Sequence, residues 1–188
     1  MLLFQKYYQL VKKYSNWRSW LFSFVIVILS YYVVNSSFIG AEYVRQISGG
    51  TAILDTYFYF PPHVAYDVLT ALGTSVRAAY FWVNIMEIIF PITYGIFLTI
   101  SFTMTYTFIY PPESKRNWLI LMPLLAMAAD FAENICIFLM IINFPTPLIG
   151  LATAASLLIP LKYTLIVVAA LLIFQGNMKV TSKLFGKK

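Results

Sequence analysis

The sequence contains one cysteine, Cys136, and one histidine, His63. A single cysteine excludes an intrachain disulfide framework and a thiol pair for redox chemistry. His63 lies beside Pro62, outside the long apolar runs, and no Glu-x-x-His pair occurs, so the pattern of a helical metal site is missing. We therefore predict no bound metal ion and no cofactor.

Motifs of the common enzyme classes are missing too. The sequence has no glycine-rich phosphate loop, no Gly-x-Ser-x-Gly elbow and no His-Glu-x-x-His, so we assign no catalytic residue. Charged residues make up only 11% of the chain, and the net charge is +6. The basic residues flank apolar runs instead of forming one patch, which argues against nucleic acid as a partner.

What the sequence does contain is apolar residues, at 61% of the chain. Residues 17–38, 78–109, 118–142 and 148–174 each form a run long enough to cross a lipid bilayer. The prediction is an all-α fold: a four-helix transmembrane bundle that forms a single integral membrane domain over residues 1–188. We expect the first run to be retained, because no convincing small-x-small signal-peptidase site follows Val34.

Two segments flank these runs. Residues 1–18 combine basic residues with an apolar stripe at positions 3, 7, 10, 11 and 14, which predicts an N-terminal amphipathic helix at the membrane interface. Residues 39–76 form the longest segment outside the runs, and Pro62 and Gly73 frame a short helix over 62–72. We expect this short helix to lie on the extracytoplasmic side.

Orientation follows from the basic residues. Ten of them fall on one side of a four-span chain, namely Lys6, Lys12, Lys13, Arg18, Lys115, Arg116, Lys179, Lys183, Lys187 and Lys188. The opposite side holds only Arg45 and Arg77. By the positive-inside rule, both termini are predicted to be cytoplasmic.

Polar residues interrupt the apolar runs. Asp130, Glu133 and Asn134 share one helical face in the third run, at spacings of three and four residues. An ionisable side chain at the centre of a membrane helix costs about 2.5–3.5 kcal/mol on insertion scales, so such a face needs partners on neighbouring helices. The second run offers a polar stripe of Arg77, Tyr80, Asn84, Glu87, Pro91 and Tyr94, and the fourth offers Lys162 and Tyr163.

We predict that these groups meet in one buried site. Asp130, Glu133 and Lys162 fall near the middle of their runs at about 1.5 Å rise per residue, and Arg77 falls near the outer end. Three carboxyls, Glu87, Asp130 and Glu133, would face the two cations Arg77 and Lys162, which leaves one negative charge without compensation. A raised carboxyl pKa or a bound cation would restore the balance.

Three functions remain open from these residues. The first is a non-enzymatic membrane protein that binds or moves a proton, a cation or a small polar or lipid ligand at a site open to the extracytoplasmic side. The second is a structural subunit of a membrane complex, whose cluster only sets helix packing. The third is a lipid-modifying membrane enzyme. The lipid bilayer is the expected partner, with a homodimer as a further possibility.

Several short motifs carry a resemblance to a known group. They are Asp55, Tyr66, Leu69 to Gly73 (Leu-x-x-Leu-Gly), Arg77-x-x-Tyr80, Phe90-Pro91-x-x-Tyr94 and Asp130-x-x-Glu133-Asn134. With them the chain resembles a group of small four-span bacterial-type membrane proteins of uncharacterised function, over roughly residues 55–165. It departs from that pattern at Glu87, where an aspartate is usual, and at Ser75-Val76. The resemblance implies the four-span topology and this choice of site residues, and it implies no activity.

Overall fold

The computed structural model describes residues 2–111 and 114–185, and these residues form helices joined by loops. Four helical stretches are long and apolar enough to cross a membrane, which confirms the all-α prediction with four candidate spans. Pro112 and Glu113 of the loop after the second run, and Lys187 and Lys188 of the basic tail, lie outside the described residues.

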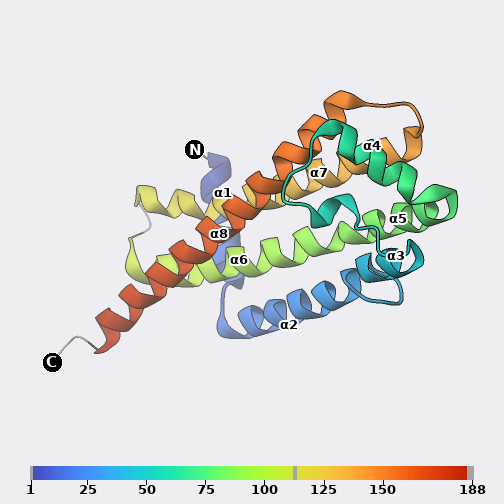
Figure 1. The fold of residues 1–188 in the computed structure, drawn as a ribbon. Coiled ribbons are helices and arrows are strands. Elements are labelled where there is room, and N and C mark those ends of the chain that lie inside the picture. The colour runs from blue at the N-terminus through green and yellow to red at the C-terminus, as the bar shows by residue number, and fades with distance from the viewer. Residues whose placement is uncertain (1, 112–113, 186–188) are drawn as a thin grey trace.

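The helices follow the predicted order with shifted ends (Figure 1). Their bounds are α1 Leu2–Tyr14, α2 Trp17–Val34, α3 Ala41–Ile47, η1 Leu54–Thr56, α4 Pro62–Ala71, α5 Gly73–Glu87, α6 Ile89–Ile109, η2 Lys115–Leu121, α7 Met122–Asn143 and α8 Ile149–Phe185. The first apolar run stops being helical at Val34 instead of residue 38, and α8 continues well past the predicted end at residue 174.

The second crossing is made of two helices, α5 and α6, which meet at Ile88. Pro91 lies four residues after Glu87 and has no backbone N–H, so the carbonyl of Glu87 lacks its usual helical donor. This explains the break, and it places Glu87 at a joint between two helices. Pro160 removes the same kind of bond in α8, yet that helix runs through it without a break.

The bundle is organised around α6, which packs against α1, α2, α7 and α8. At the end opposite the C-terminus, α3, η1 and α4 fold over α5, α7 and α8 (Figure 1), and we call residues 41–71 the cap. Gly73 joins α4 to α5 with a φ of 68°, a left-handed conformation that favours glycine. The predicted short helix therefore exists and ends as expected.

Helix α1 is docked on the bundle. Tyr8, which the predicted stripe left out, is its most buried described side chain at 5% exposure, and the ring of Phe4 stacks on that of Trp118 with centroids 4.2 Å apart. Leu10 and Tyr14, which the stripe included, remain 57% exposed. Tyr7 and Val11 of the predicted stripe pack on the bundle with Tyr8, so the stripe is divided between the bundle and the outer surface of α1.

We predict that Gly176→Ala destabilises the fold more than Gly150→Ala does. A Cβ at Gly176 would collide with the methyl group of Thr105, whereas a Cβ at Gly150 would meet no atom within 4 Å. Thr105 cannot rotate away freely, because its hydroxyl donates to Asn177 Oδ1 at 2.9 Å. Overpacking should cost about 1–3 kcal/mol at Gly176 alone, and the gain of up to about 1 kcal/mol in helix propensity inside α8 offsets only part of it. Gly150 lies in the first turn of α8, where alanine changes the helix propensity little.

Equilibrium unfolding in detergent micelles would measure this difference. Equal stabilities for the two variants would contradict the close approach of α8 to α6 at Gly176.

Candidate functional site

The site is built on one face of α7. Asp130, Glu133 and Asn134 are all buried, and Glu133 has no exposed surface. Their spacing places the three side chains on the same side of the helix, where α7 meets α8, α5 and α6. The predicted inward polar face of the third crossing is therefore confirmed.

Lys162 of α8 reaches both carboxyls of this face. Its Nζ lies 2.6 Å from Glu133 Oε2 and 3.3 Å from Asp130 Oδ1, and its side chain is itself almost fully buried. Asn134 Nδ2 donates to Asp130 Oδ1 at 3.3 Å, and the Tyr94 hydroxyl of α6 donates to Asp130 Oδ2 at 3.0 Å. Side chains from three separate crossings thus meet, as the sequence predicted.

Glu87 and Asn84 of α5 lie in the same interior, at 8% and 2% exposure. Glu87 Oε2 and Asn84 Nδ2 have no hydrogen-bond partner among the residues that the structure describes, and the same holds for Glu133 Oε1. Buried polar atoms are usually bonded to protein, water or ligand. Three such atoms therefore lie in the interior between α5 and α7.

Arg77 requires a correction. It was expected to balance the carboxyls, but its Nη1 donates to the carbonyl of Leu69 at 2.7 Å and its guanidinium lies 4.0 Å from the ring centroid of Phe144. The arginine thus holds the end of α4 against the loop after α7. Arg77 can reach these partners because it lies near the outer end of the second run, and it is not part of the carboxyl cluster.

Tyr80 is hydrogen-bonded to Asp55, a carboxyl group that the predicted site did not include. The Tyr80 hydroxyl donates to Asp55 Oδ2 at 2.6 Å and accepts a bond from the backbone N–H of Leu54 at 3.2 Å. These bonds bring η1 of the cap down onto α5. Asp55 appears among the motifs of the resemblance, and that was the available signal, because its own surroundings in the sequence are those of a loop.

A cavity of about 400 Å³ lies beside this cluster. Asp55, Glu87, Asp130 and Lys162 supply its charged wall, and Tyr31, Phe90 and Tyr163 supply aromatic surface. Tyr163 is 41% exposed and its ring stacks with that of Phe58 in the cap. Residues 53–56 cover one side of the cavity, so the predicted position beneath the 39–76 segment holds.

The cluster lies at different levels of the helices that surround it. Asp130 is near the middle of its helix, but the cavity is also lined by Tyr31, Val34 and Asn35, where α2 ends. Helices α5, α7 and α8 continue beyond that level and support the cap. The cluster therefore lies level with the end of α2 and near the middle of α7.

The charge balance is more negative than the sequence predicted. With Asp55 added and Arg77 removed, four carboxyls (Asp55, Glu87, Asp130 and Glu133) face the single ammonium group of Lys162. Four negatives less one positive leave three charges to be compensated by protons or by bound cations. No group of three His, Cys, Asp or Glu side chains in residues 2–111 and 114–185 is placed to hold a metal ion.

Comparisons with known proteins returned no match: no family profile, no curated protein and no solved structure is similar to this chain.

We predict that Lys162→Met destabilises the protein by about 3–5 kcal/mol, because it leaves two buried carboxylates without their partner. The double variant Lys162→Met with Glu133→Gln should recover part of this loss, since one of those charges is then removed. Unfolding in detergent micelles measures both.

Lys179→Met is the matched control, because it makes the same change on an exposed face of the same helix, and it should cost less than about 1 kcal/mol. If Lys162→Met were as stable as the unmodified protein, the ion pairs would not hold α7 to α8.

Proposed function

We propose that this chain is an integral membrane protein whose cavity binds a cationic group, with Asp55 and Glu87 as its principal contacts. The observation that carries the proposal is the surplus of carboxyls over Lys162, together with unpartnered oxygens of Asp55 and Glu87 beside the cavity. A buried charge without a partner costs several kcal/mol, so a site of this kind favours a bound cation or protons.

The aromatic side chains favour an organic ammonium group as the ligand. Tyr31, Phe90 and Tyr163 line the same cavity as the carboxyls. Aromatic faces attract cations by about 0.5–2 kcal/mol, and they are the usual surroundings of alkylated ammonium groups. A metal ion would instead prefer several converging oxygen ligands.

Lys162 does not turn the cavity into an anion site. Its ammonium group is already held by Asp130 and Glu133. An anionic ligand would therefore meet carboxylates from α5, η1 and α7 before it met a free positive charge. Ligand binding is expected to release protons, because a cation replaces the protons that compensate the carboxyls of the empty site.

The positions of the basic residues at one end of the bundle support the orientation proposed from the sequence. Arg116 and Lys179 both donate to the hydroxyl of Tyr110, at 2.6 and 3.3 Å, and Lys183 donates to the carbonyl of Ile109. These basic residues gather at the end opposite the cap. With that end cytoplasmic, the cavity beneath the cap faces the extracytoplasmic half of the membrane.

The motif residues support a shared site in the resembling group of small membrane proteins. Two motif pairs are bonded directly: Asp55 with Tyr80, and Tyr94 with Asp130. We propose that these pairs form the common core of the binding site in that group.

We predict that tetramethylammonium binds the purified protein in a non-ionic detergent, and more strongly as the pH rises, because protons compete for the same carboxyls. Glu87→Gln should weaken binding by about tenfold or more. Isothermal titration in two buffers of different ionisation enthalpy measures both the affinity and the protons released.

Asp67→Asn is the control, because Asp67 is exposed on α4 of the cap, away from the cavity, and its loss should leave binding unchanged. Absence of binding at any pH, or equal affinities for the Glu87 and Asp67 variants, would refute the cation site.

We predict the membrane orientation from cysteine labelling. In a Cys136→Ala background, a cysteine at the exposed Gln46 in α3 should react with an impermeant maleimide in intact cells. A cysteine at the exposed Thr181 in α8 should react only after permeabilisation. The reverse pattern would invert the orientation, and labelling of both from outside would contradict four crossings.

A further inference from the structure

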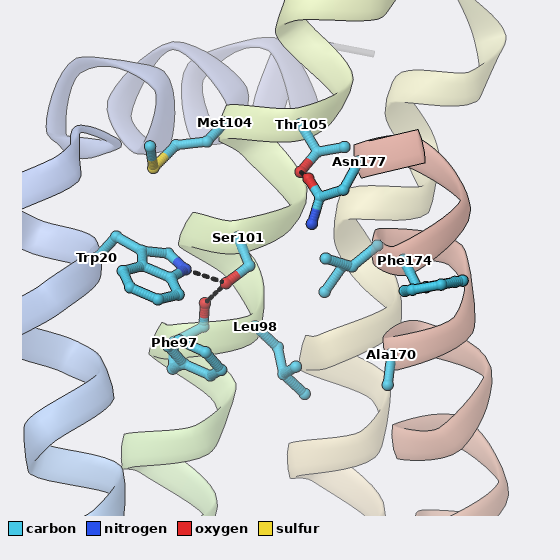
Figure 2. Close-up of a pocket in the computed structure, with 10 residues that line it drawn as sticks. Trp20, Phe97, Leu98, Ser101, Met104, Thr105, Ala170, Phe174 and Asn177 are labelled. Carbon is cyan, nitrogen blue, oxygen red and sulfur yellow. Dashed lines mark hydrogen bonds between the residues drawn. The ribbon is translucent and has the colours of Figure 1, made fainter. Parts of the chain in front are cut away.

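A second cavity, of about 480 Å³, lies between α2, α6 and α8 on the side of the bundle away from the cap (Figure 2). Its walls are largely apolar, with Trp20, Phe97, Leu98, Ala170 and Phe174 around the open space. Most of its polar groups are hydrogen-bonded to one another: Trp20 Nε1 donates to Ser101 Oγ at 3.0 Å, and Thr105 donates to Asn177 Oδ1 at 2.9 Å, which leaves the amide nitrogen of Asn177 at the far end. This cavity therefore suits hydrocarbon.

Both cavities lie over α6 between α2 and α8, and we call this groove the furrow. Figure 2 shows α2 and α8 on opposite sides of α6, with the second cavity between them. The charged cavity is lined by the same three helices, one to two turns nearer the cap on α6 and α8. On α8 the lining residues Tyr163, Ile166, Ala170 and Phe174 recur at spacings of three and four, which places them on one face.

The length of the furrow matches an acyl chain. From Pro91 at the charged cavity to Thr105 at the far end of the apolar one, α6 rises about 21 Å at 1.5 Å per residue. Half of the hydrocarbon core of a bilayer is about 15 Å thick. A chain that starts at the charged cavity can thus run along the furrow for the full depth of one leaflet.

We propose that the ligand of the charged cavity is a cationic amphiphile: an alkyl chain with an ammonium headgroup, which enters sideways from the lipid between α2 and α8. This rests on the cation site proposed above. The headgroup lies against Asp55 and Glu87, and the chain lies along Leu98 and Ala170. Charge complementarity selects the headgroup, because an anionic one would face the carboxyls. The apolar wall of the second cavity selects the chain.

The test compares tetramethylammonium with dodecyltrimethylammonium, which carry the same headgroup without and with a chain. In one non-ionic detergent, the long-chain compound should bind at least about tenfold more tightly, because the micelle holds the chain beside the opening between α2 and α8 and the chain packs against the apolar cavity wall. Ala170→Phe places a ring in the apolar cavity, and it should abolish this gain while leaving tetramethylammonium binding unchanged.

Leu171→Phe is the matched control, because Leu171 is exposed on α8 but does not line the cavity, and it should preserve the gain. If tetramethylammonium binds in a Glu87-dependent way but the chain adds nothing, or Ala170→Phe has no effect, the amphiphile is refuted and the cation site stands. If neither compound depends on Glu87, the cation site itself fails, and the amphiphile fails with it.

Discussion

The ammonium group of Lys162, held between Glu133 and Asp130, is the interaction on which the interior of this protein depends. Each of these ions would cost several kcal/mol if it were buried alone. Together they satisfy one another, and the bonds from Tyr94 and Asn134 occupy both oxygens of Asp130. Because Lys162 belongs to α8 and the carboxyls belong to α7, the same contact sets how these two long helices are aligned.

The cap increases the surplus of negative charge from two to three, because it adds Asp55 to Glu87, Asp130 and Glu133, which face the one ammonium group of Lys162. Tyr80 is fully buried in α5, and its hydroxyl needs partners there; it finds them in Asp55 and in the backbone of Leu54. That bond stabilises the folding of η1 over the bundle, and it also adds a fourth carboxyl to a cluster that has one cation. A contact that holds the cap in place therefore also enlarges the charge imbalance of the site.

The position of α2, which ends at Val34, determines one side of the furrow. Ser30 and Thr93 share a hydrogen bond of 2.7 Å, and Trp20 bonds Ser101, so α2 follows α6 along its length. Helix α8 packs mainly on α7 and on another side of α6. A furrow remains between α2 and α8, polar where α2 ends near the cluster and apolar towards Trp20. The furrow is thus polar at one end and apolar at the other, as a lipid molecule is.

The sequence by itself determined the helical class, the four candidate crossings and the inward face of Asp130, Glu133 and Asn134. These features follow from hydropathy and helical periodicity, which act within one segment. It also indicated Lys162, because a lysine within an apolar run needs a carboxylate.

Only the tertiary structure decided which groups share the cavity. Arg77 turned to Leu69 and Phe144, and Asp55 joined through Tyr80, 25 residues away in the chain. Such pairings depend on how the cap folds back, and no local pattern contains that information. The end of α2, the continuation of α8 to Phe185 and the furrow between them were decided the same way, because each depends on which faces of α6 the neighbouring helices occupy.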